Sequence, residues 1–196
     1  AYATWFVPGI TAYGVIMATF ANVAIATTVS RDQGLLKRIQ GTPLPGWVFL
    51  AGRACSAVLT AAIIVAATLG LGRLAYGVPI RAAMLPALGV TLLLGAVCCT
   101  VLGLAVTAVI PNADAAPAMV NAIVLPLTFI SGIWMATADD AWTTTVARLF
   151  PVRALAHALQ HAFLPATTGA GFVPADLVTL AVWTALGALA FRRWFR

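Results

Sequence analysis

Charged residues are scarce in this sequence: they make up 8% of its 196 residues, whereas 62% are hydrophobic. A soluble domain carries about 25% charged residues. The chain therefore has too little charge to cover a water-facing surface, which excludes a soluble globular protein. Its apolar runs are long and lack the two-residue alternation of barrel strands. We therefore predict an all-α fold, that of a polytopic helical membrane protein.

Cysteines are few and carry no metal-binding pattern. Cys55, Cys98 and Cys99 all fall inside apolar runs, and the adjacent Cys98 and Cys99 cannot form an ordinary disulfide. We interpret them as small residues that face lipid or the protein core. No metal site and no catalytic residue is assigned.

Two absences concern the energy source. No Gly-x-x-x-x-Gly-Lys-Ser/Thr phosphate loop is present, so the chain cannot hydrolyse ATP itself. No carboxylate lies at membrane depth, which argues against a proton-driven transporter. The aspartates that flank the spans lie at span ends: Asp114, Asp139, Asp140 and Asp176. The net charge of +6 is scattered without an aromatic-interleaved patch, so no nucleic-acid partner is expected.

What is present is a series of apolar runs that predict a single transmembrane domain over residues 1–196. The expected spans are residues 3–29, 47–71, 83–110, 115–135 and 176–191. Residues 136–175 contain shorter helical pieces, at 141–150 and 152–164, which suit external interfacial or re-entrant helices. Trp183 lies inside the last span, where an interfacial aromatic belt does not explain it. Since the chain starts without methionine inside an apolar run, we expect a sixth span before it.

One polar stretch, residues 30–45, interrupts the apolar runs. Ser30 and Gln33 have the spacing of a capping box, and Gly41 followed by Pro43 would end a helix. The stretch therefore predicts a helix of about ten residues with one apolar side. So short a helix is marginal in water, which means that a membrane surface or another protein must hold it. Lysine and arginine counts place this stretch and the C-terminus on the cytoplasmic side.

The same stretch resembles a motif of the type-2 ABC exporter permeases. Residues 31–44 read RDQGLLKRIQGTPL and are similar to the family's Arg-Glu-x-Gly-x-x-x-Arg-x-x-Ala-Thr-Pro-Leu, with Asp32 for the glutamate and Gly41 for the alanine. A second motif, FISGI at residues 129–133, resembles the family's Ser-Gly turn after its fifth span. Phe150-Pro151 follows it, as in the segment that leads to the family's last span.

The resemblance implies a membrane-spanning permease subunit of an ATP-driven exporter in a bacterial plasma membrane, moving an amphipathic drug, antibiotic or lipid-like substrate. ATP and Mg²⁺ would be bound by a separate ABC ATPase subunit, and a second copy or a sister permease would complete a dimer among membrane lipids. The stretch at 30–45 would be the coupling helix that docks on the ATPase. Its expected contact residues are Arg31, Asp32, Gly34, Leu35, Leu36, Lys37, Arg38, Ile39, Thr42 and Pro43.

Uncharged polar residues at membrane depth are candidates for the translocation path. They are Thr19, Asn22, Asn121, Thr128 and Ser131. Such residues either line a path or hydrogen-bond between helices, and the second outcome is the commoner one.

Several alternatives remain open from the sequence. The weaker alternative for the polar stretch is an interfacial helix on anionic lipid. For the whole protein, the alternative function is a secondary transporter or channel without an ATPase. Ser131 with His157 invites an intramembrane hydrolase. His157 and His161 share a helical face and would start a zinc site, with Asp139 and Asp140 as further ligands, but such a site needs three or four ligands.

Overall fold

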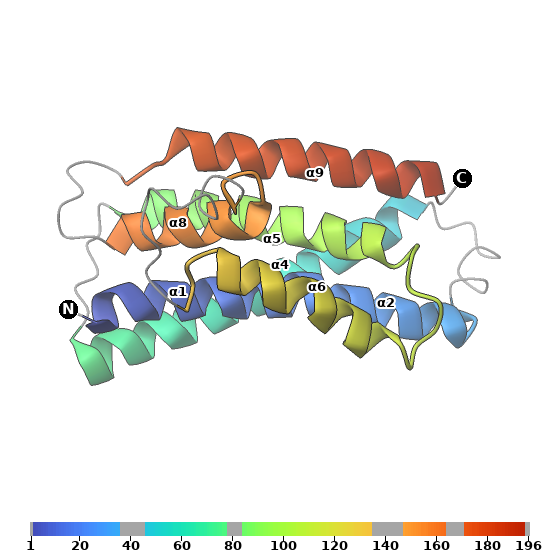
Figure 1. Ribbon diagram of the computed structural model, residues 1–196, viewed down its shortest axis with the longest axis horizontal. Coiled ribbons are helices and arrows are strands. Elements are labelled where there is room, and N and C mark those ends of the chain that lie inside the picture. The colour runs from blue at the N-terminus through green and yellow to red at the C-terminus, as the bar shows by residue number, and fades with distance from the viewer. Residues whose placement is uncertain (1, 36–45, 78–83, 135–146, 164–170, 195–196) are drawn as a thin grey trace.

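The computed structural model describes residues 2–35, 46–77, 84–134, 147–163 and 171–194 (Figure 1). These residues form a bundle of helices that run along one long axis, and no strand occurs in these ranges. The helices are α1 (Tyr2–Ile16), η1 (Met17–Ala21), α2 (Asn22–Asp32), α4 (Gly46–Tyr76), α5 (Leu85–Val106), α6 (Ala116–Ile130), α8 (Pro151–Phe163) and α9 (Pro174–Trp194).

Within the described residues, four helical stretches are long and apolar enough to cross a membrane. They are Phe6–Asp32, Ala51–Ala75, Leu85–Val106 and Pro174–Phe191. The prediction of an all-α, polytopic membrane protein is therefore confirmed.

The fourth expected span, residues 115–135, is shorter than predicted. Helix α6 has 15 residues, or about 23 Å at 1.5 Å per residue, whereas a hydrocarbon layer is about 30 Å thick. The apolar run continues to Trp134, but a turn follows at Ser131, and Gly132 adopts a φ of 75°. A glycine in this left-handed conformation ends a helix whatever the hydropathy of the next residues. The Ser-Gly turn expected from the family resemblance is thus present.

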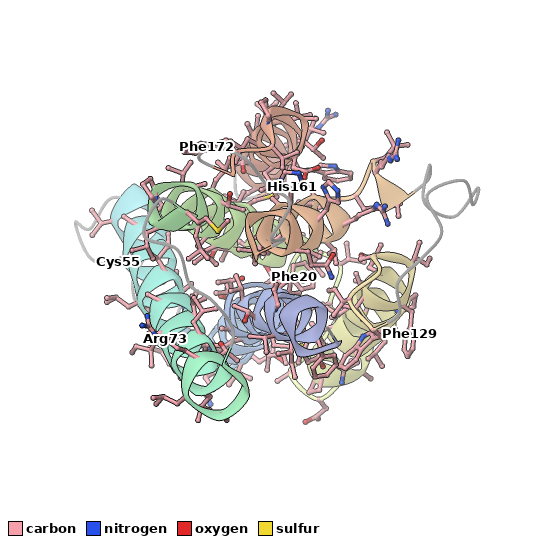
Figure 2. The ribbon with its side chains drawn as sticks, turned by 90° about the vertical axis from the view of Figure 1, so that its left-hand side faces the viewer. Phe20, Cys55, Arg73, Phe129, His161 and Phe172 are labelled. Carbon is pink, nitrogen blue, oxygen red and sulfur yellow. The ribbon has the colours of Figure 1, made fainter. Side chains whose placement is uncertain are left out.

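The first span is one long helix with a π-turn, η1, at its centre. Gly103 of α5 packs against this turn: a Cβ atom at Gly103 would lie 2.7 Å from the carbonyl oxygen of Phe20. Only glycine permits so close an approach. Figure 2 shows the side chain of Phe20 in the middle of the bundle, where it joins the hydrophobic core.

The capping box predicted at Ser30 and Gln33 is wrong. Ser30 lies inside α2, which continues to Asp32, and its hydroxyl donates to the carbonyl oxygen of Ala26 at 2.7 Å. No helix-breaking residue follows Val29 at once, so the apolar span extends and Ser30 uses an i−4 carbonyl instead of capping. The turn that follows α2 contains Gly34, which has a φ of 72°. Residues 36–45, with the rest of the predicted short helix, lie outside the described residues.

Helix α8 occupies the place where the sequence predicted a short helix over 152–164. It packs against α1, α5 and α9, and Figure 1 shows it beside the half of α9 nearer Pro174. Of the other predicted piece, 141–150, residues 141–146 lie outside the described residues. Residues 147–150 form a turn, closed by the amide of Phe150 donating to the carbonyl oxygen of Ala147 at 2.9 Å.

Trp183 explains how the start of α8 is held. Its indole N–H donates to the carbonyl oxygen of Leu149 at 2.6 Å, and its ring stacks on Phe150 with centroids 6.2 Å apart. Trp183 lies near the middle of α9. The turn before α8 therefore reaches about halfway along α9, and α8 runs back from there.

Candidate functional site

Arg31, in the last turn of α2, binds the end of another helix. Its Nη1 donates to the carbonyl oxygen of Thr107 at 2.9 Å. Its Nη2 donates to the carbonyl oxygens of Ile110 at 2.7 Å and Pro111 at 3.0 Å. These acceptors follow the last residue of α5, where carbonyl groups lack helical partners and carry the negative end of the helix dipole. Arg31 therefore binds the C-cap residue of α5 and the turn that follows it.

Asp32 binds the next part of the same turn. Its Oδ2 accepts a hydrogen bond from the amide of Ala113 at 2.5 Å, and its Oδ1 lies 3.4 Å from Nε of Arg31. Asn112 accepts in turn from the amide of Ala115, just before α6. We call Arg31 and Asp32, with the 107–113 turn that they bind, the Arg31 clamp. It joins the end of the first span to the connection between α5 and α6.

A second contact joins the helices that precede and follow residues 36–45. Arg53, near the start of α4, donates from Nη2 to the hydroxyl of Ser30 at 3.3 Å. The helix that enters this segment and the helix that leaves it are thereby tied to each other. The helices before and after residues 36–45 are thus connected by a direct side-chain contact.

The expected ATPase-contact residues divide into two groups. Arg31 and Asp32 are used inside the chain, Gly34 forms the turn after α2, and Leu35 is 45% exposed. The others lie outside the described residues: Leu36, Lys37, Arg38, Ile39, Thr42 and Pro43.

The candidate path residues also fall into two groups, one buried and one exposed. Thr19, Thr128 and Ser131 are buried, and their hydroxyls donate to carbonyls three or four residues earlier in their own helices. Asn22 and Asn121 are exposed instead. Asn22 is the one exposed residue between Phe6 and Arg31 in the described chain.

The two exposed asparagines lie on neighbouring helices, since α2 packs against α6. On α6, Asn121 shares its face with Leu125 and Phe129, which are 44% and 59% exposed. Figure 2 shows Phe129 pointing away from the bundle. This face of α6 thus presents an amide together with apolar side chains, a composition suited to an amphipathic ligand or to another polar helix.

The described residues do not bring together the side chains expected for an intramembrane hydrolase or for a zinc site. His157 Nδ1 lies 2.7 Å from Asp176 Oδ2, while the Ser131 hydroxyl binds the carbonyl of Leu127. No hydrogen bond joins Ser131 to His157 in these ranges. The rings of His157 and His161 have centroids 6.0 Å apart, and no group of three metal-binding side chains occurs in the part of the chain that the structure describes. Asp139 and Asp140 lie outside that part.

The sequence reading missed two features. The acceptors of the Arg31 clamp are backbone carbonyls, which no residue pattern reveals. The pairing of His157 with Asp176 joins residues of two different helices, and only the fold brings them together. The contact of Trp183 with the turn before α8 did have a signal in the sequence, because Trp183 stood out as a tryptophan inside a span.

The described residues thus form a bundle of long apolar helices, the fold of a polytopic membrane protein. The family model described as ABC-2 type transporter matches residues 2–164. The chain therefore belongs to the ABC-2 type transporter family and is a membrane-spanning permease of an ABC transporter. No curated protein matches the chain. Permeases of this family work in general with an ABC ATPase partner.

Proposed function

We propose that this chain is the membrane subunit of a bacterial ATP-driven exporter that moves an amphipathic drug, antibiotic or lipid-like substrate, with ATP and Mg²⁺ bound by a separate ATPase. The Arg31 clamp is the observation that carries the proposal. A driven transporter needs a rigid connection between the ATPase contact and the spans. Here the root of the 36–45 segment is tied to α4 through Arg53 and to the α5–α6 turn through Arg31.

In this proposal residues 30–45 lie in the cytoplasm, and the ATPase contacts Lys37 and Arg38 through acidic side chains. Movement of the segment would pass through Arg31 to α5 and α6 together. The substrate path would run along the face of Asn22 and Asn121, between this chain and a second permease copy or a sister permease.

The coupling role is tested with the double variant Lys37→Glu, Arg38→Glu in membranes that contain the ATPase partner. We expect normal membrane insertion, loss of ATPase co-purification and loss of ATP-driven accumulation of rhodamine 6G in inside-out vesicles. Arg73→Glu is the matched control, because Arg73 is exposed in the last turn of α4, at the other end of that helix. Normal co-purification and normal export in the double variant would refute the coupling role.

The path is tested by thiol modification. Cys55 is exposed and is first replaced by alanine, while Cys98 and Cys99 are buried. We expect Asn22→Cys to react with a water-soluble thiosulfonate and to be protected by rhodamine 6G. Ala62→Cys, on the exposed face of α4, should react slowly in lipid and show no protection. Equal reaction at both positions would remove Asn22 from the path.

A further inference from the structure

A cavity of about 300 Å³ lies between the start of α8, the turn before it and the first turns of α9. Its lining residues are Arg148, Arg153, Ala154, His157, Val173, Ala175, Asp176 and Thr179. We call it the α8–α9 pocket. Figure 2 shows side-chain nitrogens gathered where α8 lies beside α9, near the labelled His161.

Among the described residues that line the pocket, the charges do not balance. Arg148 and Arg153 contribute two guanidinium groups, and Asp176 contributes one carboxylate. That carboxylate already has a partner in the wall, since Asp176 Oδ2 lies 2.7 Å from Nδ1 of His157. Within the described ranges, no atom accepts a hydrogen bond from either arginine or forms an ion pair with it. The described walls of the pocket therefore carry an excess of positive charge.

Arg153 is the critical residue because it is buried. It is 8% exposed, and it lies in the first turn of α8, which begins about halfway along α9. A charged side chain at such a depth is strongly unfavourable unless an opposite charge or hydrogen-bond acceptors surround it. Arg153 also opens onto the cavity instead of onto packed protein. Arg153 is thus a buried cation that has no ion-pair partner among the described residues.

The backbone adds to the same potential. Residues in the first turns of both α8 and α9 line the pocket, so the first turn of each helix contributes positive dipole potential to its walls. Backbone N–H groups in a first helical turn have no carbonyl partner within the helix and are suited to an oxyanion. Asp176, at the start of α9, opposes this effect, but it does so while bound to His157.

We propose that the α8–α9 pocket binds a phosphate group, with Arg153 and Arg148 as its principal ligands. Guanidinium groups bind phosphate oxygens through paired, charge-assisted hydrogen bonds. The volume is enough for a phosphate with part of its substituent. The phosphate is either the headgroup of a membrane lipid or a free phosphate ion, and both present the same oxygens to the arginines. The assignment is independent of the proposed exporter function, since binding needs no ATPase.

The test measures binding to the full chain in neutral detergent micelles by native mass spectrometry. One arm adds dioleoyl phosphatidylglycerol, and the other adds inorganic phosphate at constant ionic strength. We expect Arg153→Met and Arg148→Gln each to weaken binding about tenfold, the value of one charge-assisted hydrogen bond. Arg73→Gln serves as the control and should leave binding unchanged.

The outcomes separate the two sources. Binding of phosphatidylglycerol without competition by inorganic phosphate identifies a lipid headgroup, whereas tight binding of inorganic phosphate identifies the free ion. Arg153→Lys retains the charge and should recover most of the affinity, which distinguishes a lost ligand from a misfolded pocket. Absence of binding in both arms, or equal affinity in the wild type and in Arg148→Gln, would overturn the proposal.

Discussion

Arg31 and Arg153 are both arginines within one turn of a helix end, and their surroundings are opposite. Arg31 donates to three backbone carbonyls and lies beside Asp32. Arg153 is more deeply buried, and it opens onto a cavity without an acceptor among the described residues. The dipoles differ as well: Arg31 meets the negative end of α5, whereas Arg153 lies in the first turn of α8, at the positive end of that helix.

This difference separates a structural arginine from one suited to a ligand. At the Arg31 clamp every strong donor has an acceptor that the fold supplies, so the residue stabilises the chain. In the α8–α9 pocket the fold provides positive charge and space but leaves the acceptor to come from elsewhere. The same substitution should therefore have opposite effects on stability at the two positions.

The largest effect is expected from Arg31→Met. It removes three charge-assisted hydrogen bonds and leaves the carbonyls at the end of α5 without their donor. We expect a loss of about 3 kcal/mol in the free energy of unfolding, reduced from the full sum because Arg31 is partly exposed. Urea unfolding of the purified chain in detergent, followed by circular dichroism, measures it. Unchanged stability would show that water molecules replace the hydrogen bonds of Arg31 at no cost in free energy.

Arg153→Met should instead raise the free energy of unfolding. Replacing a buried charge that lacks a partner with an apolar side chain of similar length is often stabilising. In phosphate-free detergent we expect the variant to gain about 1–2 kcal/mol over the wild type in the same urea experiment. Added phosphate should narrow the gap, because only the wild type binds it. A destabilised variant under phosphate-free conditions would contradict the contrast with Arg31.

The general architecture was accessible from the sequence because hydropathy reports directly on membrane burial. Long apolar runs without charges have few alternatives to spans, and the Ser-Gly turn followed from a local motif. The errors arose where two rules compete. At Ser30 a capping pattern competed with helix continuation, and continuation prevailed because nothing before Gly34 ends the helix.

The candidate sites were much less accessible. Arg31 was expected to contact the ATPase, but its acceptors lie near residue 110, and they are backbone carbonyls that have no sequence signature. Arg153 was not a candidate site residue in the sequence, because the excess of positive charge around it depends on which side chains the fold brings beside it. Long-range pairs such as His157 with Asp176 follow from topology, which a single sequence does not specify.

The smallest effects on stability are expected from replacing the two aspartates, Asp32 and Asp176. Asp32→Asn and Asp176→Asn both replace a carboxylate by an amide that retains a hydrogen-bond acceptor, so each should change stability by less than about 1 kcal/mol. Their effects on phosphate should differ. Removal of the Asp176 charge eliminates the one carboxylate in the described pocket wall, which should strengthen binding of inorganic phosphate by about threefold to tenfold.

Asp32→Asn is the matched control, because it makes the same chemical change at the clamp, where every charge already has a partner in the chain. Native mass spectrometry under the conditions used for the pocket measures both variants. If Asp176→Asn weakened phosphate binding, the carboxylate would act by orienting His157 toward the ligand, not by opposing the anion. Equal gains in both variants would mean that overall charge, and not the pocket, attracts phosphate.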